Sequence, residues 1–161
     1  MSRRRDVMSW GVIALVLMLV SMAAVYVLWP QLQPHTTLHL GDGIFTAQVA
    51  KTQAARDRGL TGTPSLSADN AMIFVYDTDG KWPINMKDMN FPIDIVWLNK
   101  DKQVIYIVKN VPPESYPYQQ FAPKDDARYV VELAAGVVGQ KSIDINATAQ
   151  FDENNLQGIQ F

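Results

Sequence analysis

Beyond residue 37 the chain is a succession of short apolar runs separated by turn-forming residues. The runs are rich in Val, Ile, Phe, Trp and Tyr and are bounded by Gly, Pro, Asn and Asp, a pattern typical of β-strands. Strands at short intervals are typical of an antiparallel sandwich or barrel. We therefore predict a mostly β, antiparallel sandwich- or barrel-like domain with one short helix over residues 38–151. The predicted strands are TLHL, IFTAQVA, AMIFVY, PIDIVWL, QVIYIVK, RYVVELAAG and KSIDINATAQF.

Local residue chemistry places two turns and one helix. Gly41-Asp42-Gly43 joins the first two runs, and glycines supply positive φ at low cost, so this segment predicts a hairpin. Asn99 to Lys102 predicts a second hairpin loop. Thr52 suits a helix N-cap and Gly59 a helix end, which predicts a short helix between them.

The first thirty residues have a different character. Three arginines near the start are followed by a run without charge from Val7 to Pro30. About 20 apolar residues span the roughly 30 Å hydrocarbon core of a bilayer, and arginines are retained on the cytoplasmic side. We therefore predict a transmembrane helix: a single pass through the inner membrane, a cytoplasmic N-terminus and a periplasmic or extracellular C-terminal domain.

A cleaved signal peptide is the alternative, with Ser21-Met22-Ala23 as a poor small-x-small cleavage site. The apolar character continues to Trp29, where a signal peptide would already be polar, and this favours an uncleaved anchor. The predicted organisation is a cytoplasmic stub and anchor over 1–30, a linker over 31–37, the β domain over 38–151 and a frayed tail over 152–161.

Charge and cysteine content exclude several classes of protein. The net charge is −2, and residues 1–30 contribute +2 from three arginines and one aspartate, so the remainder carries −2 − 2 = −4. This mildly acidic remainder disfavours binding to nucleic acid, which requires cationic side chains to neutralise phosphates. The chain has no cysteine, so lipoprotein anchoring, disulfides and thiolate metal sites are excluded.

Four segments of the chain form an ordered set of motifs: Arg56 to Thr61, Ala71 to Tyr76, Asn85 to Ile95 and Tyr129 to Gly136. In order and spacing they resemble the motifs R-x-x-G-L-M, G-M-L-F-V-F, W-M-K-N-T-x-x-P-L-D-I and Y-V-L-E-L-P-A-G. These motifs are typical of a bacterial and archaeal family, the domain of unknown function 192. The resemblance covers about residues 44–148.

The resemblance implies a compact, mostly β, sandwich-like fold and frequent export, and it implies no established activity. Three departures bear on any site that the family shares. Asn85 replaces the tryptophan before Met-Lys, Asp88-Met89 replaces Asn-Thr, and the loop after Val111 lacks the cysteines that many relatives carry.

Asp94 is a carboxylate within an apolar predicted strand, where alternation places it with Val96 and Leu98. A buried carboxylate needs hydrogen-bond donors or a cation. We expect Arg58, Lys87, Asp94 and Glu132 to approach one another at one end of the sheet, with Arg128 also beside Glu132. Such a cluster is either a structural network or the floor of a pocket for an anionic or hydroxylated ligand.

The proline- and aromatic-rich loop from Val111 to Pro123 is a second candidate site. Tyr116 and Tyr118 offer flat faces for an envelope glycan or a protein ligand, since amphipathic rings contact much surface at little entropic cost. The competing interpretation is that these rings cover the open edge of the sheet, with prolines preventing edge pairing.

Metal binding and catalysis find little support. Met72, Met86 and Met89 with His35 or His39 suit Cu(I) in ligand type, but methionine is also the ordinary filler of cores. Neither a serine-hydrolase motif nor a phosphate-binding loop is present. We therefore expect a membrane-anchored, non-enzymatic binding or accessory module of the cell envelope, without cofactor or metal. The alternative is a hydrolase of envelope polymers that uses Asp94 and Glu132 as a carboxylate pair.

Overall fold

The structure, a computed structural model, describes residues 3–28 and 34–152, with side chains described for 10–23 and 34–152. The chain divides into two compact units, residues 1–33 and 34–161. The predicted tail from residue 153 onward and the predicted linker over 31–33 lie outside the described residues. Strand β1 begins at His35, so the last three residues of the predicted linker belong to the sheet.

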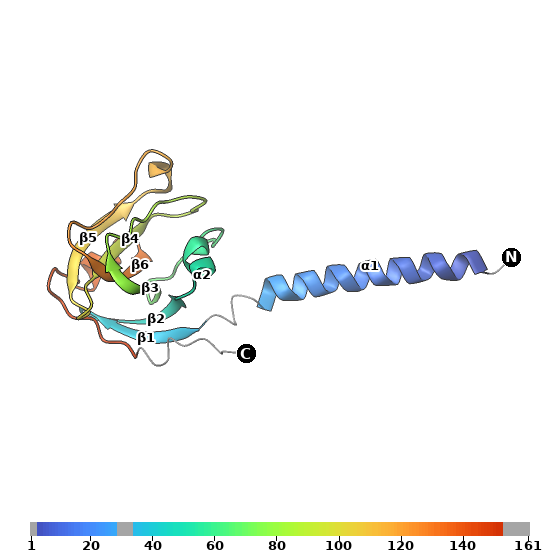
Figure 1. Ribbon diagram of the computed structural model, residues 1–161, viewed down its shortest axis with the longest axis horizontal. Helices are drawn as coiled ribbons and strands as arrows, with labels where there is room; N and C mark the ends of the chain where they lie inside the picture. The colour runs from blue at the N-terminus through green and yellow to red at the C-terminus, as the bar shows by residue number, and fades with distance from the viewer. Residues whose placement is uncertain (1–2, 29–33, 153–161) are drawn as a thin grey trace. The chain divides into compact units, whose positions relative to one another are not determined.

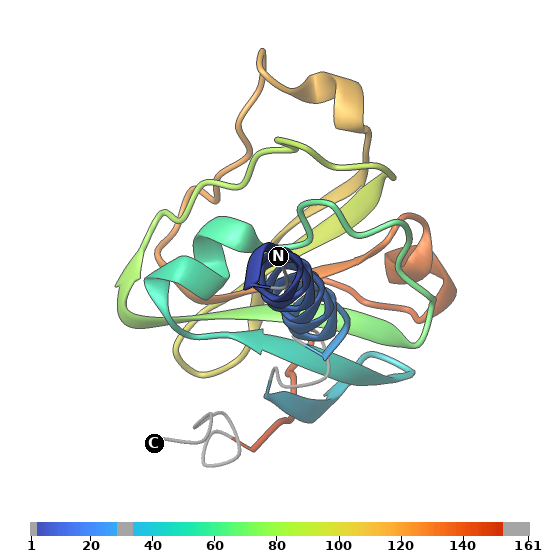
Figure 2. The same ribbon diagram turned by 90° about the vertical axis from the view of Figure 1, so that its right-hand side faces the viewer.

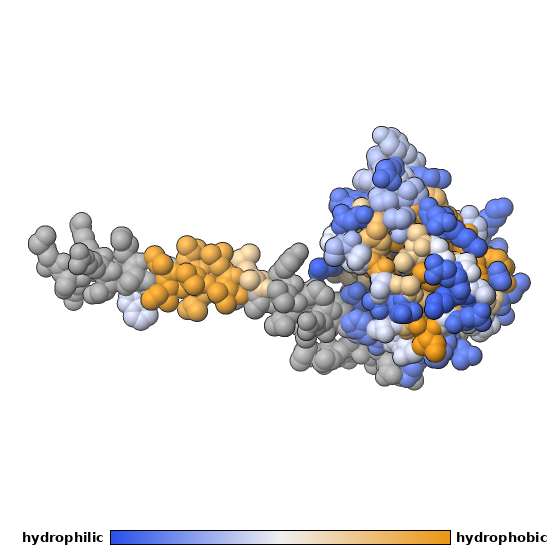
Figure 3. Space-filling model, turned by 180° about the vertical axis from the view of Figure 1, so that it is seen from behind, coloured by the Kyte–Doolittle hydropathy of each residue, from blue (hydrophilic) through white to orange (hydrophobic). Residues whose placement is uncertain are grey.

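The first unit is a helix, α1 (Arg3–Leu28). Its described large apolar side chains, from Trp10 to Met22, are all exposed, and Figure 3 shows this segment as an apolar band. Among the residues that the structure describes, no helix combines the length and the apolarity that crossing a membrane requires. The predicted transmembrane helix is therefore not confirmed.

The second unit contains one six-stranded sheet in the order β1-β2-β3-β6-β4-β5 (Figure 1). The predicted strand-rich fold is confirmed, but the predicted sandwich or barrel is wrong, because the sheet is single and does not close. The strands are β1 (His35–Leu40), β2 (Gly43–Ala50), β3 (Asn70–Gly80), β4 (Ile93–Leu98), β5 (Val104–Val111) and β6 (Ala127–Ala134).

All pairings are antiparallel except that of β2 with β3. This parallel pair is joined by a crossover that contains α2 (Gln53–Arg58), as parallel neighbours require. Figure 2 views the sheet from the side on which α2 lies. The helix is as predicted: the Thr52 side chain accepts the Ala55 N–H at 3.2 Å, and Gly59 ends it with a φ of 48°.

Each face of the sheet has its own hydrophobic core, which explains why no second sheet is needed. One cluster contains Leu38, Val96 and Leu133, packed under the four-residue helix α3 (Val137–Gln140) and the segment that follows it. The other contains Phe74, Ile95 and Trp97, packed under α2 and the loops beside it. Helices and loops therefore supply the layers that a second sheet supplies in a sandwich.

The last predicted strand, residues 141–151, does not form. In place of a strand, the described residues of this segment form isolated bridges, from Thr148 to Gln103 and from Gln150 to His39. Ser142 and Asn146 adopt positive φ values of 50° and 70°, which interrupt an extended conformation. The preceding helix α3 was not predicted, because four residues are too few for helical periodicity to be visible.

Candidate functional site

A cavity of about 350 Å³ opens on the face of the sheet that α2 covers. Its lining comes from α2 and the turn after it, from β3, from the segment between β3 and β4, and from one residue of β6. Most of these groups are polar or aromatic. The lining residues that carry the following argument are Arg56, Arg58, Tyr76, Trp82, Lys87 and Glu132.

Glu132 forms the floor of the cavity. It projects from the middle of β6 with 5% of its surface exposed, and its Oε2 atom has no hydrogen-bond partner among the described residues. Burial raises the pKa of Glu132 to about 8, because the charged form loses its hydration. At pH 7 the carboxyl is therefore mostly protonated, and it offers the cavity both a hydrogen-bond donor and an acceptor.

Aromatic rings and a guanidinium form one wall. The Tyr76 and Trp82 rings stack in parallel with their centroids 4.0 Å apart, and the Arg56 guanidinium lies 4.9 Å from the Tyr76 centroid. Burial raises the pKa of the Tyr76 hydroxyl, the Arg56 charge opposes that rise, and Glu132 contributes to it. Tyr76 on β3 and Glu132 on β6 therefore line the same cavity.

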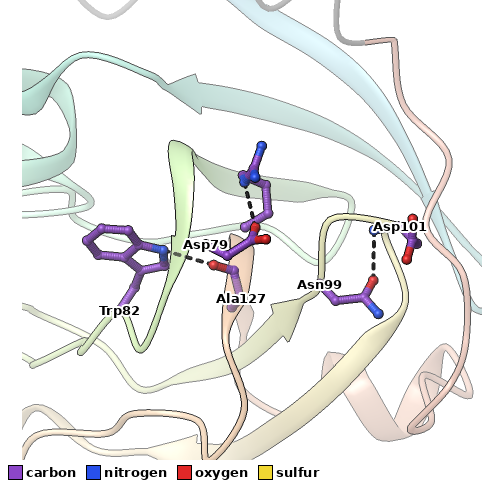
Figure 4. A network of polar contacts seen from close by, with 6 residues as sticks. Asp79, Trp82, Asn99, Asp101 and Ala127 are labelled. Atoms are coloured by element: carbon purple, nitrogen blue, oxygen red, sulfur yellow. Dashed lines mark hydrogen bonds and ion pairs between the residues drawn. The ribbon is translucent and has the colours of Figure 1, made fainter.

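Trp82 is held in place by the sheet itself. Its Nε1 donates to the Ala127 carbonyl at 2.9 Å, as Figure 4 shows. The Trp97 Nε1 in turn donates to the Trp82 carbonyl at 2.9 Å. A Cβ on Gly80 would lie 3.0 Å from the Trp82 ring, so the absence of a side chain there makes room for the ring. The wall is thus a fixed part of the fold.

The three cations of the site have different roles. Arg56 is tied to the backbone, donating to the Val75 carbonyl at 2.9 Å and also to the Lys51 carbonyl. Arg58 and Lys87 are exposed, and no hydrogen bond or ion pair of their side chains occurs within the described part of the chain. These two side chains are therefore available to a ligand at the rim.

The structure brings together three of the four predicted cluster residues, because Arg58, Lys87 and Glu132 line the same cavity. Asp94 does not join them. Glu132 pairs with Ile95 across the sheet, whereas Asp94 pairs with Leu133, so the two carboxyl groups project from opposite faces. The predicted approach of all four side chains is therefore wrong.

Asp94 has backbone partners instead of cations. It is fully buried; Oδ1 accepts the Asn110 N–H at 2.7 Å and Oδ2 accepts the Val138 N–H at 2.9 Å. The predicted partner of Glu132, Arg128, instead forms an ion pair with Asp79 at 2.7 Å. Asp94 therefore ties β4 to β5 and α3, while Glu132 is left to face the cavity.

The proline-rich loop lies apart from the cavity. Tyr118 is 90% exposed and Tyr116 is 40% exposed, and neither lines the cavity. A short 3-10 turn, Pro113–Ser115, shapes the loop, which extends away from the sheet in Figure 1. Phe121, near the end of the loop, forms an isolated β-bridge with Ile84, which lines the cavity.

Arg56 and Tyr76 are site residues that the sequence did not lead us to predict, whereas the Trp82 ring was considered together with the rings of the proline-rich loop as a face for a ligand. Arg56 begins the R-x-x-G-L motif and Tyr76 ends the next motif. Their positions in the motifs could therefore have identified them as candidate site residues. Within the described ranges no group of three or more His, Asp or Glu residues is placed to hold a metal ion. Met72 and Met86, considered above as copper ligands, are buried in the core.

Comparisons with known proteins agree with the motifs. The DUF192 family, described as "Uncharacterized ACR", matches residues 36–151, which confirms the resemblance. A "UPF0127 protein" of Thermococcus sibiricus is 26% identical over 98 residues, which cover 61% of this chain and 60% of the relative. The chain thus spans about three fifths of the length of the curated relative it matches.

Two solved structures share the fold. One, from Sinorhizobium meliloti, is described as a "putative transcription regulator"; its TM-score is 0.66 at 22% identity, covering 73% of this chain and 92% of that chain. The other, a protein of unknown function from Novosphingobium aromaticivorans, has a TM-score of 0.66 at 21% identity and covers 72% and 83%. At these identities the likeness concerns the fold alone.

Proposed function

This chain belongs to the DUF192 family, and we propose that its family domain is a non-enzymatic binding module that takes a small ligand into the Glu132 cavity. The observation that carries the proposal is the buried Glu132 Oε2, which has no partner in the described structure. Buried polar atoms are nearly always hydrogen-bonded, so an unpaired one that faces a cavity marks the place of a missing partner.

The size and composition of the cavity support this proposal. Ligand pockets measure roughly 300–1,000 Å³ and combine aromatic walls with a few polar groups that fix orientation. At about 350 Å³ the cavity suits a molecule of the size of a monosaccharide or an amino acid. The stacked Tyr76 and Trp82 rings form the wall, and Glu132, Arg58 and Lys87 supply the polar groups.

The alternative, a hydrolase that uses Asp94 and Glu132, is not favoured. A glycosidase needs its two carboxyl groups about 5 to 10 Å apart across one cleft. Asp94 projects from the opposite face and is occupied by two backbone N–H groups. Among the described residues that line the cavity the other acid is Asp57, which is exposed and accepts a hydrogen bond from Gln53.

The Sinorhizobium structure is described as a "putative transcription regulator", a class of protein that commonly binds DNA. Binding of DNA is not favoured for this chain. Residues 31–161 carry a net charge of −4, obtained from −2 for the whole chain less +2 for residues 1–30. Binding to DNA depends chiefly on cationic side chains that neutralise phosphates. We therefore keep the proposal of a small-molecule or envelope ligand.

The binding proposal is tested by nuclear magnetic resonance of the isotope-labelled full chain with a panel of small polar fragments. We expect shifts at Gly59, Trp82 and Lys87 for several fragments. E132L, which replaces the carboxyl by an apolar group, should abolish those shifts, whereas D126A on the exposed surface should not. A panel that perturbs no cavity residue would refute the binding module.

We further propose that α1 attaches this domain to the inner membrane and that the domain faces the envelope. The support is the uncharged sequence from Val7 to Pro30 after three arginines, and the exposure of the large apolar side chains described within α1. Membrane fractionation of cells expressing the full chain is the test, followed by protease treatment of spheroplasts. Recovery in the soluble fraction, or protection of the domain from external protease, would overturn this location.

A further inference from the structure

The polar groups at the floor of the cavity are less exposed to solvent than those at its rim. Glu132 at the floor is 5% exposed and the Tyr76 hydroxyl is partly buried, whereas Arg58 and Lys87 are exposed at the rim. A ligand that satisfies all of them therefore has two unlike ends. One end enters a dry environment and the other remains in contact with water.

The end at the floor is expected to be uncharged and able to form hydrogen bonds. An apolar group there would leave the Glu132 Oε2 unpaired, which is the costly state that binding should relieve. An ion at the floor would lose its hydration without a buried counter-charge. A hydroxyl group meets the requirement, because it donates and accepts and so matches both the Glu132 carboxyl and the Tyr76 hydroxyl.

The end at the rim is expected to be anionic. With Glu132 protonated, the charged residues that line the cavity are Arg56, Arg58 and Lys87 against Asp57, a formal sum of 3 − 1 = +2. Arg56 is committed to backbone carbonyls, which leaves Arg58 and Lys87 to meet the ligand. The same two cations repel an ammonium group, so an amine ligand is disfavoured.

We infer that the ligand of the cavity is a small hydroxylated anion, a sugar acid or a sugar phosphate. Its hydroxyl end binds Glu132 and Tyr76, and its anionic end binds Arg58 and Lys87. This inference rests on the proposed function, since it assumes that the cavity binds a ligand at all. Carboxylate and phosphate share the chemistry that these cations recognise, so the test includes both.

The test is isothermal titration of the full chain with four probes: D-glucuronate, D-glucose 6-phosphate, D-glucose and cyclohexanecarboxylate. We expect at least one of the two hydroxylated anions to bind roughly five- to tenfold more tightly than D-glucose, the factor that two exposed charge pairs supply. Cyclohexanecarboxylate should bind more weakly than the anionic sugar because it leaves Glu132 unpaired. The tighter binder of the two anions shows whether the cavity prefers a carboxylate or a phosphate.

Variants assign the preference to its residues. R58Q/K87Q should reduce the preference for the anionic sugar over D-glucose to about twofold or less. K109Q/K124Q removes the same charge from exposed positions away from the cavity and should leave the preference unchanged. Equal binding of D-glucose and both anions, or an unchanged preference in R58Q/K87Q, would overturn the inference.

The failure of this inference is distinguishable from that of the binding module. If none of the four probes binds while other fragments shift Trp82 and Lys87 in the resonance screen, the ligand class is wrong and the binding module stands. If neither experiment detects a molecule in the cavity, both proposals are wrong. Detection of D-glucuronate or D-glucose 6-phosphate with the expected preference supports both.

Discussion

The Asp94 carboxylate accepts the backbone N–H of Asn110 at 2.7 Å, at a point where β5 bulges against β4. Ile93 pairs with Val111 and Ile95 with Val108, so two residues of β5 lie opposite Asp94. Asn110 has a φ of 53° there, and its N–H turns out of the ladder toward the carboxylate. A bulge leaves backbone groups unpaired, and Asp94 restores the missing partner.

Replacing Asp94 by Ala is expected to destabilise the domain strongly. The change removes the acceptor for the buried N–H of Val138 and for the partly buried N–H of Asn110, and a buried unpaired donor costs about 1–3 kcal/mol. We expect the free energy of unfolding to fall by roughly 2–5 kcal/mol in urea denaturation. The cavity lies on the other face, so binding by the folded fraction should not change.

The matched control for this change is D126A, because Asp126 is exposed on the loop before β6. Its free energy of unfolding should stay within about 0.5 kcal/mol of the original chain. A D94A chain as stable as D126A would show that the two hydrogen bonds contribute nothing.

The stability of the domain should decrease with pH because of Glu132. Burial raises the pKa from 4.5 in the unfolded chain to about 8 in the folded chain, so the folded state holds the extra proton between these values. The contribution is fully present below pH 4.5 and is lost as pH rises toward 8. The slope is at most about 1.4 kcal/mol per pH unit within this window and vanishes above it.

Urea denaturation of the original chain and of E132Q from pH 4.5 to pH 9 measures this contribution. Glutamine does not titrate, so the difference between the two free energies isolates the contribution of the Glu132 proton. We expect the original chain to lose stability relative to E132Q as pH rises. A difference that stays constant across the range would rule out the raised pKa.

Two arginines on α2 should differ sharply in their effect on stability. Arg56 donates to the Val75 and Lys51 carbonyls and stacks on Tyr76, whereas Arg58 has no such contact among the described residues. We expect R56Q to lower the free energy of unfolding by about 1–3 kcal/mol and R58Q to change it by less than about 0.5 kcal/mol. Thermal unfolding of both variants at the same salt concentration provides the comparison. Equal losses of stability would show that the contacts of Arg56 do not stabilise the domain more than those of Arg58.

Local patterns predicted the strands well because alternation and turn chemistry act within a few residues. The β4 and β5 runs, the first hairpin and the α2 caps all follow from such patterns. Those patterns do not specify which strands become neighbours. The parallel pairing of β2 with β3 and the single open sheet depend on contacts between distant segments, which a local pattern does not encode.

The same limit explains the partial success at the site. Asp94 and Glu132 were each recognised as carboxyl groups that need an explanation, from their neighbours in the chain. Their opposite orientation follows from the register in which Ile95 pairs with Glu132, and a shift of one residue would have reversed it. The stack of Arg56, Tyr76 and Trp82 joins three segments that no sequence pattern connects.

The affinity of the cavity for a hydroxylated anion should depend on the proton of Glu132. At pH 7 the carboxyl donates a hydrogen bond, and near its pKa of about 8 it begins to lose that proton. Above this pH the floor becomes anionic and opposes an anionic ligand. We expect the Kd of D-glucuronate to be constant between pH 6 and pH 7 and to rise by up to about tenfold per unit above pH 8.

Isothermal titration of E132Q with the same probe tests whether Glu132 is responsible. The glutamine amide still donates a hydrogen bond but does not titrate, so its Kd should stay constant from pH 6 to pH 9. The other titratable or charged groups that line the cavity are unchanged in this variant, so they affect both profiles alike: Arg56, Asp57, Arg58, Tyr76 and Lys87. If E132Q loses affinity above pH 8 as the original chain does, one of these groups and not Glu132 controls binding.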